Sequence, residues 1–262
     1  MKPIFEVKKL STGYETPVVQ EISFSVFPGE IVGLLGRNGE GKTTLLRGIT
    51  GGTRVFSGEV WVQGESCAAL SVRKQATRLS LLPQQTEVME GILAKELIAM
   101  GLYPRRRLFS PLRKADHEAI RAAADKLGVA DLLQADCGKL SQGQRKLILL
   151  TRLLVQDAPV LLLDEPDAAL DFYNTHLFFS TLRRLVKDTG KAALAVLHHP
   201  ELALRQCDRL LILKDGRLAG EIHPKTDDSE TIEATLRLLY PSILVQKDEG
   251  LGQLHCYFRE TN

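Results

Sequence analysis

Residues 31–44 read IVGLLGRNGEGKTT, and this stretch decides the fold. Its first five residues are apolar and predict a buried strand, whereas LLRGI at residues 45–49 predicts the first turns of a helix. Between them, the glycines and Lys42-Thr43 match the phosphate-loop (P-loop) pattern G-x-x-x-x-G-K-[ST] in the strand-to-helix context that the pattern requires. The stretch therefore predicts a phosphate-binding corner of an α/β sheet.

The chemistry of such a loop follows from its residue types. Glycines let backbone N–H groups turn inward around phosphate oxygens, and the helix N-terminus adds partial positive charge. Lys42 is expected to reach the β and γ phosphates, and the Thr43 hydroxyl to coordinate Mg²⁺. The alternative interpretation is a glycine-rich turn that only caps a helix. The predicted phosphate-binding residues are Gly36, Asn38, Gly39, Gly41, Lys42, Thr43 and Thr44.

A second motif, VLLLDEP at residues 160–166, places two carboxylates where an apolar strand ends. Ligands of open α/β sheets bind at this end of the strands. Asp164 fits the residue that holds the Mg²⁺ shell, and Glu165 is the better candidate for a general base that polarises an attacking water. Taken alone, the motif is also compatible with an acidic strand end in a turn before proline.

Composition narrows the class of protein. The 262 residues are 44% hydrophobic and 25% charged, which is typical of a globular chain. A formal charge of +2 is too balanced to indicate nucleic-acid binding driven by overall charge. The apolar runs are too short for a membrane span, the start lacks the features of a signal peptide, and the four cysteines are spread singly. We therefore expect a cytoplasmic protein with reduced thiols and no nucleic-acid partner.

The pattern of periodicity divides the chain. Short alternating runs between residues 4 and 35 predict a β-rich start, helical periodicity fills the region from about 88 to 158, and strand, helix, strand returns from 160 to 197. Apolar strands alternating with helices favour a parallel sheet covered on both faces. We predict an α/β core with a β subdomain over 1–87 and 159–225, a helical subdomain over 88–158, and a C-terminal helix and hairpin over 226–262.

A third motif, LSQGQ at residues 140–144, opens the helical run QRKLILLTRLLV. By itself it is compatible with an N-cap serine followed by a polar first turn. The functional interpretation is a phosphate-binding helix start, in which the Ser141 hydroxyl and the Gly143 N–H face a γ-phosphate.

Together these motifs resemble the ABC transporter ATPases. The P-loop, LSQGQ, VLLLDEP, Ala169-Leu170-Asp171 and a strand ending in His198 occur in that family's order, over about residues 4–222. The resemblance implies a P-loop NTPase (RecA-like) core with an antiparallel β subdomain and an inserted α-helical subdomain. It also implies that two subunits sandwich two MgATP, each held by one subunit's P-loop and the other's signature sequence.

The resemblance assigns further roles. It implies that Tyr14 stacks on adenine, that Gln84 senses Mg²⁺ and water, and that His198 contacts the γ-phosphate and the catalytic water. Gln85 beside Gln84 is an alternative for that role, and a lone histidine at a strand end is more often structural. Residues implied to act across the dimer are Ser141, Gly143, Gln144 and Asp171.

The sequence departs from the family pattern at three positions. Gln142 stands where glycine is commonest in the signature, and Asp167 and Ala168 stand where threonine or serine is frequent. Asp167 places an extra carboxylate near Glu165. These departures bear on the rate of hydrolysis rather than on ATP binding.

Shorter segments resemble the ATPases of metal-chelate importers, those for ferric siderophores, haem and cobalamin. They are MGLYP at residues 100–104, LHHPELAL at 197–204, CDR at 207–209 and LYP at 239–241. This resemblance implies a membrane permease, a substrate-binding protein and a place at the cytoplasmic face of the membrane. The basic stretch 105–114 would meet the permease or is simply a solvated basic face. Alternatives are an ABC ATPase for another cargo such as molybdate or nickel, an exporter, or a soluble ATP-driven clamp.

Overall fold

The computed structural model describes residues 2–68, 70–84, 90–106, 110–168, 170–248, 250 and 252–258. Gln85, Ala169 and the middle of the basic stretch 105–114 lie outside the described residues.

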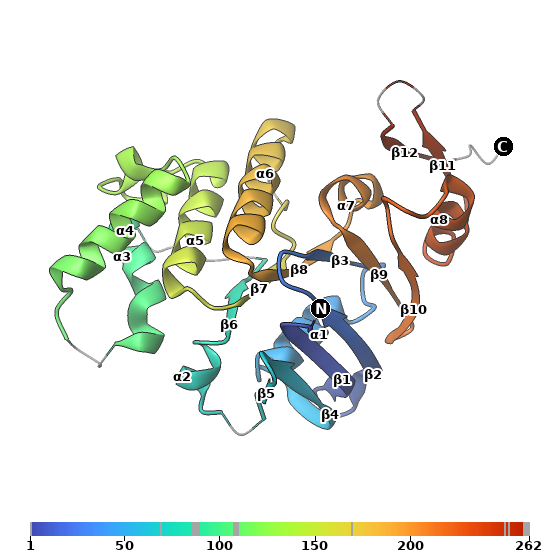
Figure 1. Ribbon diagram of the computed structural model, residues 1–262, viewed down its shortest axis with the longest axis horizontal. Coiled ribbons are helices and arrows are strands. Elements are labelled where there is room, and N and C mark those ends of the chain that lie inside the picture. The colour runs from blue at the N-terminus through green and yellow to red at the C-terminus, as the bar shows by residue number, and fades with distance from the viewer. Residues whose placement is uncertain are drawn as a thin grey trace.

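The centre of the molecule is a six-stranded sheet of order β10-β9-β3-β8-β7-β6 (Figure 1). Alternate strand residues enter two separate hydrophobic clusters, so that Leu161 and Leu163 face one side and Leu162 the other. Both faces are therefore covered, which explains strands that are apolar throughout and confirms the predicted α/β class. β10 (Arg217–Ile222) runs antiparallel to β9, and the other five strands are parallel. These five are β3 (Ile31–Leu35), β6 (Leu79–Leu82), β7 (Val160–Asp164), β8 (Ala192–Leu197) and β9 (Arg209–Lys214).

A second, antiparallel sheet of order β2-β1-β4-β5 lies beside the first. Its strands are β1 (Phe5–Gly13), β2 (Pro17–Val26), β4 (Arg54–Val62) and β5 (Glu65–Ser66). Helix α1 (Lys42–Ile49) packs against β1, β2 and β4 and also against β7 of the central sheet. This helix, which opens with the P-loop lysine, is thus fixed from both sheets. The short helix α2 (Val72–Gln75) leads back to β6.

Helices occupy one end of the molecule (Figure 1). They are α3 (Ala94–Ala99), α4 (Lys114–Lys126), α5 (Gln142–Gln156) and the 3₁₀ turns η1 (Met100–Arg105), η2 (Ala130–Leu132) and η3 (Cys137–Lys139). Helix α5 packs against α3 and α4 and also against β6 and α6. It therefore joins the helical end to the central sheet. Nowhere in the described chain is a helix both long and apolar enough to cross a bilayer.

Helix α6 stands beside α5, and the elements after it lie toward the opposite end (Figure 1). α6 (Phe172–Thr189) ends at Gly190, whose φ of 63° is the left-handed conformation that commonly ends a helix. α7 (Pro200–Gln206) follows β8. The C-terminal unit, α8 (Ser229–Leu236) with the hairpin β11 (Ile243–Lys247) and β12 (Leu254–Phe258), docks beside α7 (Figure 1).

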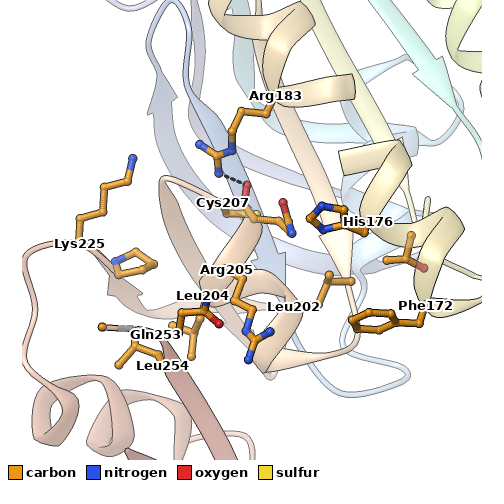
Figure 2. Close-up of a pocket in the computed structure, with 14 residues that line it drawn as sticks. Phe172, His176, Arg183, Leu202, Leu204, Arg205, Cys207, Lys225, Gln253 and Leu254 are labelled. Carbon is orange, nitrogen blue, oxygen red and sulfur yellow. Dashed lines mark hydrogen bonds between the residues drawn. The ribbon is translucent and has the colours of Figure 1, made fainter. Parts of the chain in front are cut away.

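Figure 2 shows a cavity of about 450 Å³ where α6, α7 and the hairpin meet. Its cationic lining residues are already engaged: Arg183 and Lys225 contact Asp208 at 3.3 and 2.8 Å, and Arg205 contacts Glu201 at 2.8 Å. None of the predicted catalytic residues lines it. The cavity therefore lies at the junction of the core and the C-terminal unit, away from the predicted catalytic residues.

Candidate functional site

The loop between β3 and α1 is built by its glycines. Gly39 and Gly41 have φ of 87° and 95°, a region that side chains rarely adopt. A Cβ on Gly41 would lie 2.6 Å from Val19 Cγ1, and one on Gly36 would lie 2.8 Å from the Leu213 carbonyl oxygen. The backbone of the loop is therefore confined to a path that only glycine can follow.

Lys42 is held inside this loop. Its side chain is buried, and Nζ donates to the carbonyl oxygens of Gly36 at 2.7 Å and Arg37 at 3.0 Å. Burial lowers the pKa of the ammonium, and the nearby charges of Glu165 and Asp164 oppose that shift. The loop thus carries a buried cation at the N-terminus of α1, which suits an anionic ligand.

Asp164 ends β7 and faces α1. Thr43 Oγ1 donates to Asp164 Oδ1 at 3.2 Å, and the carboxylate is buried. Burial raises the pKa of Asp164, while the hydrogen bond from Thr43 and the charges of Arg47 and Lys42 lower it. A hydroxyl beside a carboxylate offers the hard oxygen ligands that Mg²⁺ prefers, so this pair fits the predicted metal position.

Glu165 points away from its neighbour Asp164. Its φ of 48° is left-handed, a conformation that costs a non-glycine residue about 1–2 kcal/mol. The resulting turn brings Glu165 Oε1 against His198 Nε2 and lets Gln84 Nε2 donate to Glu165 Oε2. Both carboxylate oxygens are therefore engaged by side chains that arrive from β8 and from the end of β6.

Lys42, Thr43 and Glu165 line one cavity of about 420 Å³, whereas Asp164 lies outside its lining. All but one of its lining residues were predicted from the sequence, and the exception is Val18. The predicted ones are Asn38, Gly39, Gly41, Lys42, Thr43, Thr44, Gln84, Glu165 and His198. Val18 belongs to β2, in the other sheet, and nothing in its sequence context marked it. The loop's outer side lines an adjoining cavity of about 510 Å³ with Gly36, Arg37, Asn38, Glu40, His198 and Tyr240.

The signature residues form a separate cluster. Ser141 Oγ accepts from the Gln144 N–H at 3.2 Å, and Gln144 Oε1 accepts from the Ser141 N–H at 3.0 Å, which is a capping box at the start of α5. Asp171 caps α6 through the Asn174 N–H at 2.7 Å. A Cβ on Gly143 would lie 2.5 Å from the Asn174 side chain. Asn174, which joins the two helix starts, was not singled out from the sequence.

None of these signature residues lines the P-loop cavity. Tyr14 also lies outside its lining: the ring is 55% exposed, and its hydroxyl accepts from Arg47 Nη1 at 3.2 Å. The structure thus separates the predicted residues into a P-loop group and a signature group. Within one chain they do not form a single site.

Comparison with known families gives a match to the ABC transporter family over residues 19–168. The cobalamin import ATP-binding protein BtuD of Halobacterium salinarum is 35% identical over 211 residues, 80% of this chain and 52% of that protein. The chain therefore spans about half the length of that relative. The ferric enterobactin transport ATP-binding protein FepC of Escherichia coli K12 is 32% identical over 219 residues, 83% of this chain and 81% of that protein.

Among solved structures, the fold matches a chain described as a metal-chelate type ABC transporter in an inward-facing conformation. The TM-score is 0.83 at 23% identity, and the match covers 98% of this chain and 97% of that chain. The likeness extends through the helical end and the C-terminal unit.

Proposed function

The chain belongs to the ABC transporter family, and on this premise we propose that it is the ATP-hydrolysing subunit of an importer for metal chelates. The observation that carries the proposal is the placement of Glu165. Its two carboxylate oxygens contact His198 and Gln84 at a cavity that Lys42 and Thr43 also line. A carboxylate oriented in this way beside a phosphate-binding loop suits activation of a water molecule.

Nucleotide binding would use the loop and the start of α1. The backbone N–H groups and Lys42 would hold the phosphates of ATP, and Thr43, Asp164 and Gln84 would hold Mg²⁺. The metal ion supplies neutralisation of the charge on the phosphate oxygens. Tyr14, exposed in the loop between β1 and β2, would stack on the adenine as its family counterpart implies.

Hydrolysis would then depend on four side chains. Glu165 orients a water molecule and accepts its proton as the water oxygen bonds to the γ-phosphorus and the bond to the bridging oxygen of ADP breaks. His198 and Gln84 hold the carboxylate in its position, and Lys42 stabilises the charge that develops on the transferred phosphoryl group. The fixed orientation of Glu165 means that little reorganisation is needed when the reaction begins.

The signature cluster would complete the site of a second subunit, either another copy of this chain or a homologous ATPase. None of its residues lines the P-loop cavity of its own chain. They are Ser141, Gly143, Gln144 and Asp171. Their position at two adjoining helix starts suits contact with a phosphate brought by a partner. Closure around two MgATP would pull the helical ends of both subunits together.

The proposed cargo rests on the relatives, which are named as ATP-binding proteins of cobalamin import and of ferric enterobactin transport. We propose a chelate of this class, a ferric siderophore, haem or cobalamin, taken up through a separate membrane permease supplied by a substrate-binding protein. The subunit would sit at the cytoplasmic face of the membrane, with the helical end against the permease. ATP binding and hydrolysis would then move the permease through α5, which joins that end to the sheet.

Affinity purification of the tagged chain from gently solubilised native membranes tests this proposal. We expect a polytopic permease in near-equal amount and ATP hydrolysis by the complex, stimulated by a loaded chelate-binding protein. Recovery with soluble partners alone would contradict the importer assignment, and transport of another cargo class by the complex would contradict the chelate assignment.

A further inference from the structure

Lys146 is a buried lysine that the hydrolytic chemistry above does not use. It lies in the second turn of α5, behind the signature residues, and is 8% exposed. Its Nζ donates to the Gln84 carbonyl oxygen at 3.2 Å. A buried ammonium is unfavourable unless it is hydrogen-bonded and balanced by negative charge, so this position needs an explanation.

The negative charges around Lys146 belong to the site. Burial lowers the pKa of this ammonium, and the charges of Asp167, Asp164 and Glu165 oppose that shift. Asp167 is the acidic residue that replaces the family's usual threonine or serine. Its Oδ1 is buried, and no hydrogen bond reaches that atom from the described residues.

Asp164, Glu165 and Asp167 place three carboxylates within four consecutive positions. Their negative charges would repel one another at the end of β7, where little water is present. Lys42 serves the loop through Gly36 and Arg37. Lys146 is a second buried lysine, and it approaches these carboxylates from the helical side. Its hydrogen bond to the Gln84 backbone also fixes the residue whose side chain donates to Glu165.

We propose that Lys146 is a positioning residue for hydrolysis: its ammonium anchors the Gln84 backbone, so that the Gln84 side chain holds Glu165 in its orientation. The inference rests on the proposed ATPase function. It gives α5 a direct link from the signature sequence to the Gln84–Glu165 contact through one side chain.

Two variants of Lys146 test this link, with kcat and KM for ATP measured in the purified complex. We expect Lys146→Met to lower kcat about tenfold or more while KM changes less than twofold, because the P-loop is untouched. Lys146→Gln keeps a donor for the Gln84 carbonyl oxygen and should stay within about threefold of the wild type.

Lys191 provides the matched control. It is equally buried, at 6% exposure, but it pairs with Asp157 at 2.7 Å and with the Ala158 carbonyl oxygen at 3.0 Å, outside the lining of the P-loop cavity. Lys191→Met should lower the melting temperature and leave kcat of the folded protein within twofold of the wild type.

Two results would overturn the proposal. One is a Lys146→Met enzyme with kcat within twofold of the wild type, and the other is an equal loss of kcat in Lys146→Gln, because the retained donor should keep the Gln84 backbone in place. Failure of the wild-type complex to hydrolyse ATP would instead contradict the proposed function itself.

Discussion

His198 and His199 are adjacent in the chain but differ in their surroundings. His198 Nε2 contacts Glu165 and lines the P-loop cavity, whereas the His199 side chain is exposed. His198 is therefore a candidate active-site residue, and His199 serves as a matched control for its substitution.

We predict that His198→Ala lowers kcat for ATP hydrolysis by roughly 100-fold, in the range found when a group that orients a catalytic acid or base is lost. His199→Ala should stay within about twofold, because its side chain lines neither cavity at the P-loop. Steady-state ATPase measurements on both variants decide the point, and equal losses would remove the special role of His198.

Gly41 and Gly64 separate the effect of backbone strain from that of crowding. Both have positive φ, 95° and 79°, but a Cβ on Gly41 would clash with Val19, whereas one on Gly64 meets nothing within 4 Å. The two glycines differ only in what surrounds them.

Substitution of either glycine by alanine should reduce the free energy of unfolding by about 1 kcal/mol or more, through the left-handed backbone. Gly41→Ala should cost more and should also weaken ATP binding at least tenfold, because the loop must shift. Denaturant unfolding combined with nucleotide-binding titrations measures both effects. Unchanged ATP affinity in Gly41→Ala would contradict the geometry assigned to the loop.

At the scale of elements, one buried arginine ties β9 to its neighbours. The Arg209 side chain, 10% exposed, contacts Glu30 at 2.8 Å and Glu221 at 3.0 Å, and so joins β9 to the approach to β3 and to β10. Arg217 forms a comparable pair with Glu21, but its side chain is 54% exposed.

We predict that Arg209→Met reduces the free energy of unfolding by about 3–5 kcal/mol, because a buried carboxylate loses its partner. Arg217→Met should cost about 0–1 kcal/mol, since an exposed pair is screened by solvent. Chemical denaturation of both variants makes the comparison, and similar losses would show that burial of the Arg209 pair is unimportant.

The C-terminal unit reaches the candidate site through Tyr240. Its hydroxyl donates to the His198 carbonyl oxygen at 3.3 Å, and the Cys256 N–H donates to Glu201 Oε2 at 3.2 Å on the helix that follows. The unit thus steadies the segment that carries His198.

Removing the Tyr240 hydroxyl tests this contact. Tyr240→Phe should reduce the free energy of unfolding by about 0.5–1.5 kcal/mol, the usual net value of one hydrogen bond. Tyr257→Phe, at a ring that is 50% exposed, should have almost no effect. Thermal and denaturant unfolding report both, and a neutral Tyr240→Phe would mean that the unit does not steady His198 in this way.

For the whole molecule, sequence patterns predicted the site residues that lie in contiguous motifs. They missed the residues that reach the site from distant segments of the chain. The P-loop is contiguous, so its residues and its strand-to-helix setting could be located from the sequence. Val18 and Tyr240 reach the same region from β2 and from the C-terminal unit. A lysine in a helical pattern is expected to be exposed, but Lys146 is buried because α5 packs against the sheet. Such residues have no sequence signal, since their roles arise from contacts between distant segments.

The measurement that tests the account most directly is ATP hydrolysis by Glu165→Gln, made together with ATP binding. The amide keeps the shape of the side chain but cannot accept the water's proton. We predict that ATP affinity stays within about threefold of the wild type while turnover falls by roughly 100-fold or more. Near-normal turnover in this variant would contradict the assignment of Glu165 as the general base.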